Sequence, residues 1–454
     1  MAVGALGYNE MTVSLVRGTV SSSGGFMRTV RVGLIGLGTV GSGVVEILQR
    51  HAADFQRRAG VDVQLVRFAD RTTERFASLG LPAEACSSDW HDVVADDSVD
   101  VVIELIGGTG VAKEVVLAAL AAGKSVVTAN KALMATSGEE VMEAAEASGV
   151  DIAFEASVGG GIPIIGPLKH SLTGNEIQAV MGIVNGTTNY MLTRMAENGL
   201  DYATALAEAQ AKGFAEADPT ADVDGHDAAA KIAILSSIAF NSRVVLNQVH
   251  AEGIRSLAPE DLAYADEMGY TIKLLALARR MPDGVDIRVH PTMIRKSHPL
   301  ASVNGVYNAI YVIGDAVGET MFFGEGAGSL PAASAVVGDL IEVARRIETG
   351  CAPVVGCTCT ESLPVRDMAD LETEYFIRLE VADQPGVLAA VASVFGEHGV
   401  SIGSVIQKRA AEGVAQIVYV THLAREASVR SALAEIEALE VTSRIASIIR
   451  VEDL

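Results

Sequence analysis

The sequence predicts an α/β protein in three parts: a doubly wound parallel sheet, an α+β middle domain and a ferredoxin-like βαββαβ unit. Between residues 27 and 150, short runs of branched apolar residues alternate with segments of helical periodicity, which is the order that builds a parallel sheet. Residues 151–350 lack this strict alternation, and residues 374–454 follow the order strand, helix, strand, strand, helix, strand. A length of 454 residues also fits three domains of roughly 150 residues each.

Composition excludes several classes of protein. The chain has 57 acidic and 34 basic residues, and a net charge of −23 repels phosphate backbones, so we expect no nucleic-acid partner. Apolar runs such as VVLAALAA and IAILSSIAF are shorter than the roughly 18 residues of a membrane-spanning helix, so we expect no membrane partner. Four cysteines are too few for a disulfide framework. These features predict a soluble, cytoplasmic protein of enzyme size.

Residues 1–26 are expected to form a disordered extension. They are rich in Gly and Ser and show no amphipathic pattern. They also lack the basic segment and continuous apolar stretch of a signal peptide. Met27 is a candidate alternative start, because ordered sequence begins directly after it.

A glycine motif lies between the first predicted strand, residues 31–35, and the first predicted helix, residues 42–50. Gly36 permits a tight turn, Gly38 lets the backbone approach a pyrophosphate, and Gly41 lets the helix pack closely on the strand. The helix N-terminus supplies N–H groups and a partial positive charge. The motif predicts a Rossmann-type dinucleotide-binding domain over residues 27–150. Its candidate cofactor-binding residues are Gly36, Leu37, Gly38, Thr39, Val40 and Gly41.

The second predicted strand, residues 63–69, ends at Asp70 and Arg71. An acidic residue here accepts hydrogen bonds from the ribose hydroxyls of NAD, whereas the arginine would stack on adenine or bind the 2′-phosphate of NADP. Ordinary surface charge is the third interpretation, because the distance from Gly41 exceeds the usual ~20 residues. The choice between NAD and NADP stays open. Strands at 99–105 and 125–128, with a helix over 112–122 between them, complete the predicted sheet.

The middle domain is predicted over residues 151–350 as a substrate-binding and dimerisation domain, followed by an irregular linker over 351–373. The linker holds three cysteines whose spacing matches no common zinc site. The terminal βαββαβ unit, 374–454, shows no catalytic cluster and is predicted to be an accessory module. The expected strands of the middle domain are 151–158, 176–186, 287–295 and 308–317, and its expected helices are 199–213, 227–240 and 331–346.

Two loops follow predicted strands at the sheet edge where ligands bind. Lys131 comes just after the strand 125–128, where it would meet cofactor and substrate or would be a solvated loop charge. Glu155 precedes three consecutive glycines, 159–161, whose carbonyls are suited to a hard cation, with Glu155 adding charge. The alternative for this second loop is a flexible turn.

The densest polar segment is residues 214–231, FAEADPTADVDGHDAAAK. Asp227 and Lys231 are one helical turn apart and share a face, and an apolar run follows Lys231. A partly buried lysine near carboxylates is a candidate general acid/base. The alternative is a weak surface ion pair, which the acids crowded into the preceding loop disfavour.

Taken together, these segments resemble homoserine dehydrogenase in their order and spacing, over about residues 28–350. The segments that carry the resemblance are GLGTVG, TANKAL, EASVGGGIPI, GIVNGTTNY, FAEADPTADVDGHDAAAKIAIL and YADEMGYTIKLLA. The sequence DQPGVL at the first strand–helix turn of the last unit resembles an ACT domain, a module that binds amino acids at that turn. The extension 1–26 departs from the common pattern.

The resemblance implies reversible, NAD(P)H-dependent reduction of L-aspartate 4-semialdehyde to L-homoserine, in the biosynthesis of threonine, methionine and isoleucine. Lys231 matches the lysine that transfers the proton, Asp227 matches its acidic partner, and Lys131 matches a second lysine beside the nicotinamide. Glu216 matches the carboxylate that holds the substrate's amino group, with Asp222 and Asp227 near it. A positive lysine would also stabilise the developing alkoxide.

The resemblance implies further sites. Gly328 matches a glycine that touches the cofactor. The positions that match a monovalent cation site, usually occupied by sodium, are Glu155, Val158, Gly160 and Ile162. The candidate effector-binding residues are Asp383, Gln384, Pro385, Gly386, Val387 and Leu388, with L-threonine as the expected effector. A homodimer or homotetramer is expected.

Two other functions stay open from the sequence. One is an oxidoreductase of the same fold that acts on a different aldehyde or amino acid. The other is a non-catalytic amino-acid sensor built on a dehydrogenase scaffold. For the terminal module, an oligomerisation element is the alternative to a regulatory domain.

Overall fold

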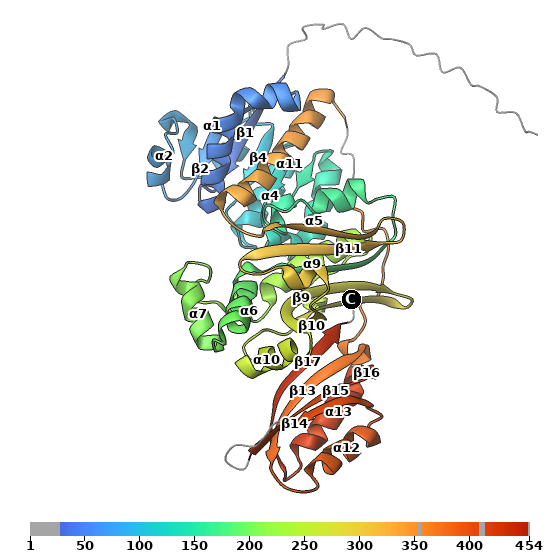
Figure 1. Cartoon of the computed structure of the whole chain (residues 1–454). Helices are drawn as coiled ribbons and strands as arrows, with labels where there is room; N and C mark the ends of the chain where they lie inside the picture. The colour runs from blue at the N-terminus through green and yellow to red at the C-terminus, as the bar shows by residue number, and fades with distance from the viewer. Residues whose placement is uncertain (1–27, 352–355, 408–413, 453–454) are drawn as a thin grey trace, which may run out of the picture.

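The computed structural model describes residues 28–351, 356–407 and 414–452, so the predicted extension 1–26 lies outside the described residues. The chain runs from a nucleotide-binding type of domain at one end, through a middle domain, to the βαββαβ unit at the other end (Figure 1). Within the described ranges, no helix combines the length and the apolar character needed to cross a bilayer.

The N-terminal domain is a six-stranded, fully parallel sheet in the order β3-β2-β1-β4-β5-β6, which confirms the doubly wound prediction. The direction of winding reverses between β1 and β4, and ligands bind at such a reversal. The strands are β1 (Thr29–Ile35), β2 (Asp62–Ala69), β3 (Cys86–Ser87), β4 (Val101–Glu104), β5 (Ser125–Thr128) and β6 (Ile152–Ala153). The helices are α1 (Thr39–Ala59), α2 (Glu74–Ser78), α3 (His91–Val94), α4 (Val111–Ala121) and α5 (Lys131–Ser148).

Helix α11 (Ser329–Thr349) packs on this N-terminal domain, although the sequence division places it with the middle domain. Its apolar face, including Val336 and Leu340, shares one core with Val32 of β1 and Val44 of α1. Figure 1 shows α11 lying beside α1. The chain therefore returns to its first domain after building most of the second.

The middle domain is built on a mixed sheet with the strand order β12-β11-β7-β9-β10. One expected strand is wrong: of residues 151–158, only Ile152–Ala153 is a strand, and Glu155–Ser157 forms a 3-10 turn. The strands are β7 (Ile177–Ile183), β8 (His250–Ala251), β9 (Tyr270–Met281), β10 (Gly284–Arg295), β11 (Tyr307–Gly314) and β12 (Gly318–Glu325). The helices are α6 (Gly186–Asn198), α7 (Tyr202–Ala211), α8 (Thr220–Val223), α9 (His226–Ala239) and α10 (Pro259–Glu267).

The C-terminal unit has the predicted βαββαβ order, with helices α12 and α13 covering one face of an antiparallel sheet (Figure 1). The short strand β16 (Ala424–Arg425) extends its edge beside β13. The elements are β13 (Glu372–Ala382), α12 (Val387–Glu397), β14 (Ile402–Gln407), β15 (Val414–Thr421), α13 (Glu426–Glu437) and β17 (Thr442–Glu452).

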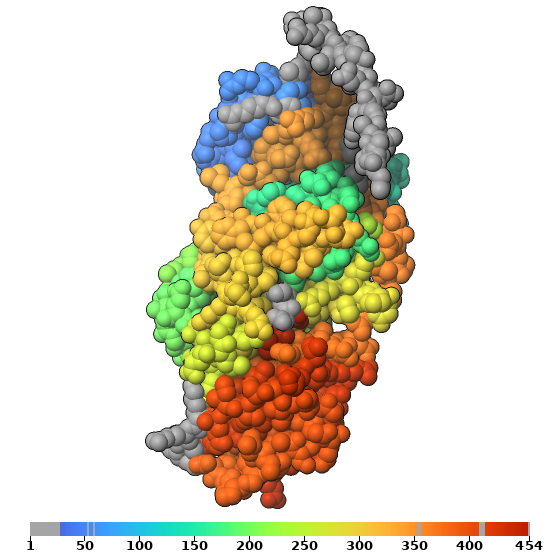
Figure 2. All heavy atoms as spheres, turned by 45° about the vertical axis from the view of Figure 1, so that its right-hand side comes forward, coloured from blue at the N-terminus to red at the C-terminus, as the bar shows by residue number. Residues whose placement is uncertain are grey.

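The C-terminal sheet continues the middle sheet, an arrangement that the sequence analysis did not predict. Strand β17 pairs in parallel with β10 between Thr292 and Arg450 and at the next two positions. Buried ion pairs cross the junction: Arg378 Nε lies 2.7 Å from Asp261 Oδ1, and Arg288 Nη2 lies 2.5 Å from Glu452 Oε1. Figure 2 shows the two parts in close contact. One eleven-stranded sheet therefore spans both domains.

The described part of the predicted linker also packs against the middle domain. Isolated bridges join Glu361 to Ser242 and Val365 to Val285. A 3-10 turn, Met368–Asp370, then leads into β13. The segment is irregular, as predicted, and it is anchored along its length.

Candidate functional site

The glycine motif forms the turn between β1 and α1, and two of its glycines are required by the backbone. Gly36 has φ +97°, and a Cβ there would lie 2.6 Å from the Leu105 carbonyl oxygen. A Cβ on Gly41 would lie 2.0 Å from the Gly36 carbonyl oxygen. By contrast, a Cβ on Gly38 would meet no protein atom within 4 Å. Open space at Gly38 fits the predicted approach of a pyrophosphate.

A cavity of about 520 Å³ lies next to this turn, at the reversal between β1 and β4. Gly38, Asp70, Arg71 and Arg75 all line it. The Asp70 carboxylate accepts hydrogen bonds from the backbone N–H groups of Leu37 (2.6 Å) and Thr72 (2.7 Å).

The arginine of α2 completes the environment of Asp70. Arg75 Nη1 lies 3.0 Å from Asp70 Oδ2. Burial raises the pKa of Asp70. The two backbone hydrogen bonds and Arg75 lower it by more than burial raises it, so the pKa lies below its ordinary value. Asp70 is thus an ionised group that ties the glycine turn to the end of β2.

Gly328 lies at the start of α11 with φ +128°. The next residue, Ser329, donates a hydrogen bond from Oγ to the Thr39 carbonyl oxygen at 2.5 Å. The N-termini of α1 and α11 therefore lie side by side. Gly328 is close to the glycine turn, although some 290 residues separate them in sequence.

Two lysines and one aspartate form the polar centre of the interface between the first two domains. Lys131 begins α5, while Asp227 and Lys231 lie on the first two turns of α9. Asp227 Oδ1 is 3.0 Å from Lys131 Nζ, and Asp227 Oδ2 is 2.8 Å from Lys231 Nζ. Lys231 Nζ also donates to the Val184 carbonyl oxygen at 2.6 Å. The structure thus brings the three predicted catalytic residues together.

Charge and burial fix the protonation state of this centre. Burial raises the pKa of Asp227, but the ammonium groups of Lys231 and Lys131 lower it more, so it lies well below its ordinary range. Burial lowers the pKa of Lys131, yet Asp227, Asp222 and Glu216 together raise it above its ordinary value. The aspartate is therefore a stable carboxylate between two cations.

Asn185 is a site residue that the sequence analysis missed. It caps α6, accepting from Thr188 N, while its Nδ2 donates to Asp222 Oδ1 at 2.7 Å and to Asp227 Oδ2 at 2.9 Å. The capping pattern in NGTT, an asparagine directly before a helix, could have located it at a strand end. Asn185 thus holds Asp222 and Asp227, two of the three acids predicted to bind the substrate. The third, Glu216, is exposed in the polar segment 214–231.

The Glu155 carboxylate is occupied by backbone amides. It accepts hydrogen bonds from Ile164 N at 2.5 Å, Ile165 N at 2.7 Å and Gly166 N at 2.6 Å. A cation at this loop would therefore be held by main-chain carbonyl oxygens, which suit hard cations. Among the described residues, no group of three or more His, Cys, Asp or Glu side chains could hold a metal ion.

Comparisons with known proteins agree with this geometry. The chain matches the family descriptions "Homoserine dehydrogenase, NAD binding domain" over residues 36–155, "Homoserine dehydrogenase" over 163–341 and "ACT domain" over 375–441. It is 48% identical over 432 residues to a homoserine dehydrogenase of Synechocystis, covering 93% of this chain and 99% of the relative. This chain belongs to the homoserine dehydrogenase family. It is an oxidoreductase with a nucleotide-binding domain of that family.

Solved structures support the assignment. A homoserine dehydrogenase from Thiobacillus denitrificans superposes with a TM-score of 0.89 at 43% identity, covering 94% of this chain and 99% of that one. A hyperthermophilic archaeal homoserine dehydrogenase in complex with NADPH covers 70% of this chain and 98% of its own length, with a TM-score of 0.61 and 28% identity.

The ACT domain of this homoserine dehydrogenase presents the predicted effector turn at its surface. Asp383, Gln384 and Pro385 are exposed, and Gly386, with φ +96°, is the residue directly before α12. A Cβ on Gly386 would meet no protein atom within 4 Å. Val387 is buried and Leu388 is 45% exposed, so an apolar side chain lies beside the open turn.

Proposed function

We propose that this enzyme catalyses the reversible reduction of L-aspartate 4-semialdehyde to L-homoserine. The observation that carries the proposal is the buried Asp227 carboxylate, which holds Lys131 and Lys231 beside an acidic loop. A bound nicotinamide dinucleotide supplies the hydride.

Lys231 transfers the proton in this proposal. An ammonium group has three N–H donors. Lys231 uses one on the Val184 carbonyl oxygen and one on Asp227, which leaves the third for the substrate oxygen. The positive charge stabilises the developing alkoxide, and the proton then passes from Nζ to oxygen.

The acidic loop selects a substrate with an α-ammonium group. Glu216 is exposed, Asp222 is held by Asn185, and both acids act electrostatically on Lys131. An aldehyde without an amino group would gain nothing from these carboxylates. The loop therefore favours an amino-acid semialdehyde over other aldehydes.

The 520 Å³ cavity would hold the adenosine half of the cofactor, and Gly38, between the N-termini of α1 and α11, would face its pyrophosphate. We favour NADP(H) over NAD(H). The Asp70 carboxylate is already bound by two backbone amides and Arg75, while Arg71 lies exposed at the cavity to meet a 2′-phosphate.

Two further parts of the proposal concern ions and regulation. A monovalent cation, sodium by preference, would be held by main-chain oxygens at Glu155, Val158, Gly160 and Ile162. L-Threonine would bind at the exposed turn that begins α12 and lower activity. The enzyme would act as a homodimer or homotetramer in threonine, methionine and isoleucine biosynthesis.

The test is a steady-state assay of the full chain with L-homoserine and NADP⁺ or NAD⁺, with and without L-threonine. We expect turnover with homoserine, a lower KM for NADP⁺ and a lower rate when threonine is added. Turnover of a different amino alcohol in place of homoserine would refute the substrate. Threonine binding without any turnover would favour the non-catalytic sensor.

A further inference from the structure

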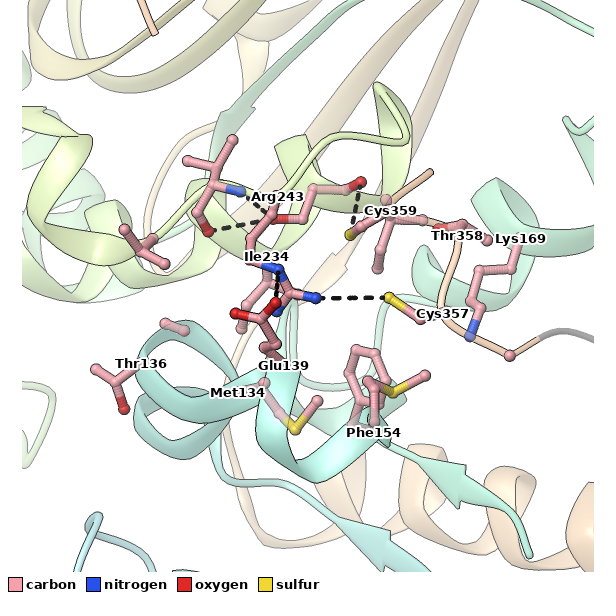
Figure 3. A pocket seen from close by; sticks show the side chains of 18 residues that line it. Met134, Thr136, Glu139, Phe154, Lys169, Ile234, Arg243, Cys357, Thr358 and Cys359 are labelled. Atoms are coloured by element: carbon pink, nitrogen blue, oxygen red, sulfur yellow. Dashed lines mark hydrogen bonds and ion pairs between the residues drawn. The ribbon is translucent and has the colours of Figure 1, made fainter. Parts of the chain in front are cut away.

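A second cavity, of about 90 Å³, is lined by residues of the two helices that carry Lys131 and Lys231, but by neither lysine. It is enclosed by α5 and α9, the helices that begin with Lys131 and with Asp227 and Lys231, and by residues 356–359 on the way to the ACT domain. Met134, Phe154 and Ile234 provide apolar walls (Figure 3). At roughly 10–15 Å³ for each water, the 90 Å³ cavity has room for about six to nine waters, and so for a small molecule such as a peroxide.

Two thiols point into this cavity from the segment 356–359. Arg243 Nη2 donates to Cys357 Sγ at 3.9 Å, and Cys359 Sγ donates to the Ser237 carbonyl oxygen at 3.7 Å (Figure 3). Burial, the charge of Cys357 and a hydrogen bond with the Cys357 thiol together raise the pKa of Cys359 to about 12. The two sulfurs are therefore neighbours in different environments.

Two cations face Cys357. Arg243 contacts the sulfur directly, and Lys169 lines the same cavity. Burial lowers the pKa of Lys169, and the largest opposing influence is the charge of Cys357. Cysteines that are partly exposed and next to Arg or Lys are the ones that react as thiolates. Both thiols are partly exposed, but only Cys357 accepts a hydrogen bond from Arg243, whereas the raised pKa of Cys359 keeps that thiol protonated.

We infer that Cys357 and Cys359 form a thiol-oxidation site, in which a peroxide oxidises Cys357 and Cys359 then closes a reversible disulfide. The Cys357 thiolate attacks one peroxide oxygen, the O–O bond breaks, and hydroxide leaves and takes up the thiol's proton as water. Cys357 is then a sulfenic acid. The Cys359 sulfur attacks it, the S–O bond breaks, and the Cys359 proton leaves with that oxygen as a second water. Both sulfurs are oxidised and the peroxide is reduced to two waters. An external dithiol then reduces the disulfide back to two thiols and is itself oxidised to a disulfide.

The site is tied to both catalytic helices. Cys357 N donates to Glu146 Oε1 of α5 at 2.7 Å, and Cys359 binds the Ser237 carbonyl of α9. A disulfide removes the Cys357–Arg243 and Cys359–Ser237 contacts together. Because α5 and α9 carry Lys131 and Asp227, 3.0 Å apart, we expect oxidation to lower activity. This consequence rests on the proposed function.

The experiment exposes the full chain to hydrogen peroxide, blocks the remaining thiols by alkylation and identifies the disulfide by peptide mass spectrometry. We expect a Cys357–Cys359 disulfide and a rate with L-homoserine roughly 5- to 150-fold lower, restored by dithiothreitol, as for typical coupling between sites. In Cys359→Ser we expect a sulfenic acid on Cys357 that dimedone captures. Cys86→Ser, far from the cavity, is the matched control and should behave as the unaltered chain.

Several outcomes would overturn the inference. Full alkylation of Cys357 and Cys359 after treatment that oxidises the exposed Cys351 would show that the cavity thiols are unreactive. A disulfide to Cys351 instead would refute the pairing. A Cys357–Cys359 disulfide with unchanged turnover would refute the link to the catalytic helices. Disulfide formation is read from the mass spectrum and does not depend on turnover. If the proposed substrate is wrong, the untreated enzyme will not turn over L-homoserine, and this result is distinct from a missing disulfide.

Discussion

Arg450 on β17 is the residue whose replacement best tests how the ACT domain is held. Its side chain is 2% exposed and makes four hydrogen bonds, to Glu426 at 2.7 and 2.9 Å and to Glu252 at 2.7 and 3.0 Å. Arg450→Met keeps much of the volume and removes the charge. Breaking a buried ion pair costs about 3–5 kcal/mol. Since Arg430 still pairs with both carboxylates, we expect Arg450→Met to lower the free energy of unfolding by about 3 kcal/mol, the lower end of this range.

The assay is thermal unfolding at neutral pH. A loss of about 3 kcal/mol lowers Tm by roughly 6–12 °C, at about 2–4 °C per kcal/mol. The matched control is Arg444→Met on the same strand, because Arg444 pairs with Glu380 at 2.6 Å but is 63% exposed. An exposed pair contributes about 0–1 kcal/mol. Equal Tm shifts for the two variants would refute the idea that the buried ion pairs of Arg450 hold the ACT domain to the middle domain.

The stability lost in Arg450→Met should depend on pH. Burial raises the pKa of Glu252, but hydrogen bonds from His250 and Arg450 lower it below the ordinary value of 4.5. Burial likewise raises the pKa of Glu426, and hydrogen bonds from Arg450 and Tyr375 lower it below the same value. A carboxyl with a lowered folded-state pKa contributes stability above its unfolded pKa and loses that contribution as the pH falls. The difference in Tm between the unaltered chain and Arg450→Met should therefore narrow below about pH 4.5. A difference that grows in acid would contradict this account.

Four other changes test the remaining sites. Lys231→Met should lower kcat roughly 10²–10⁴-fold while the Kd for NADPH stays constant, and near-normal turnover would refute proton transfer from this lysine. Gly38→Val should weaken cofactor binding in a titration without changing Tm, because a Cβ there meets no protein atom, whereas Gly36→Val should lower Tm. Arg71→Gln should raise the KM for NADP⁺ and leave that for NAD⁺, and equal effects on both would remove its role at the 2′-phosphate. Deleting residues 371–454 should yield an unstable or insoluble fragment, because β10 loses β17 and the buried Arg288 loses Glu452; a well-folded, active fragment would show that the shared sheet is dispensable.

Local sequence signals were enough to predict four of the six strands of the N-terminal sheet and the helix that carries Asp227 and Lys231. Strand 125–128 is observed as predicted, because four buried residues between turn signals leave little choice. The expected strand 151–158 ends before Glu155. The Glu155 carboxylate instead accepts hydrogen bonds from backbone amides nine to eleven residues later. That contact comes from the tertiary structure and competes with local β propensity.

Long-range pairing accounts for the rest of what the sequence could not show. The parallel contact between Thr292 and Arg450 joins residues far apart in the chain, and no periodicity marks it. The same holds for Asn185, whose bonds to Asp222 and Asp227 span 37 and 42 residues. Sequence patterns identify faces and ends of elements, whereas pairing between distant elements depends on the whole fold.

The long-range pairing of β17 with β10 has a consequence for how the protein is made. Domains generally fold as they emerge from the ribosome, N-terminal part first. Here α11 (Ser329–Thr349) must be synthesised before the core of the first domain is complete, and β17 (Thr442–Glu452) must be released before β10 and β13 gain their shared neighbour. Until then the edge of β10 exposes unpaired backbone groups, which is where nascent chains aggregate. Native assembly of the shared sheet therefore waits until β17 has been synthesised, and products that stop before β17 are substrates for chaperones.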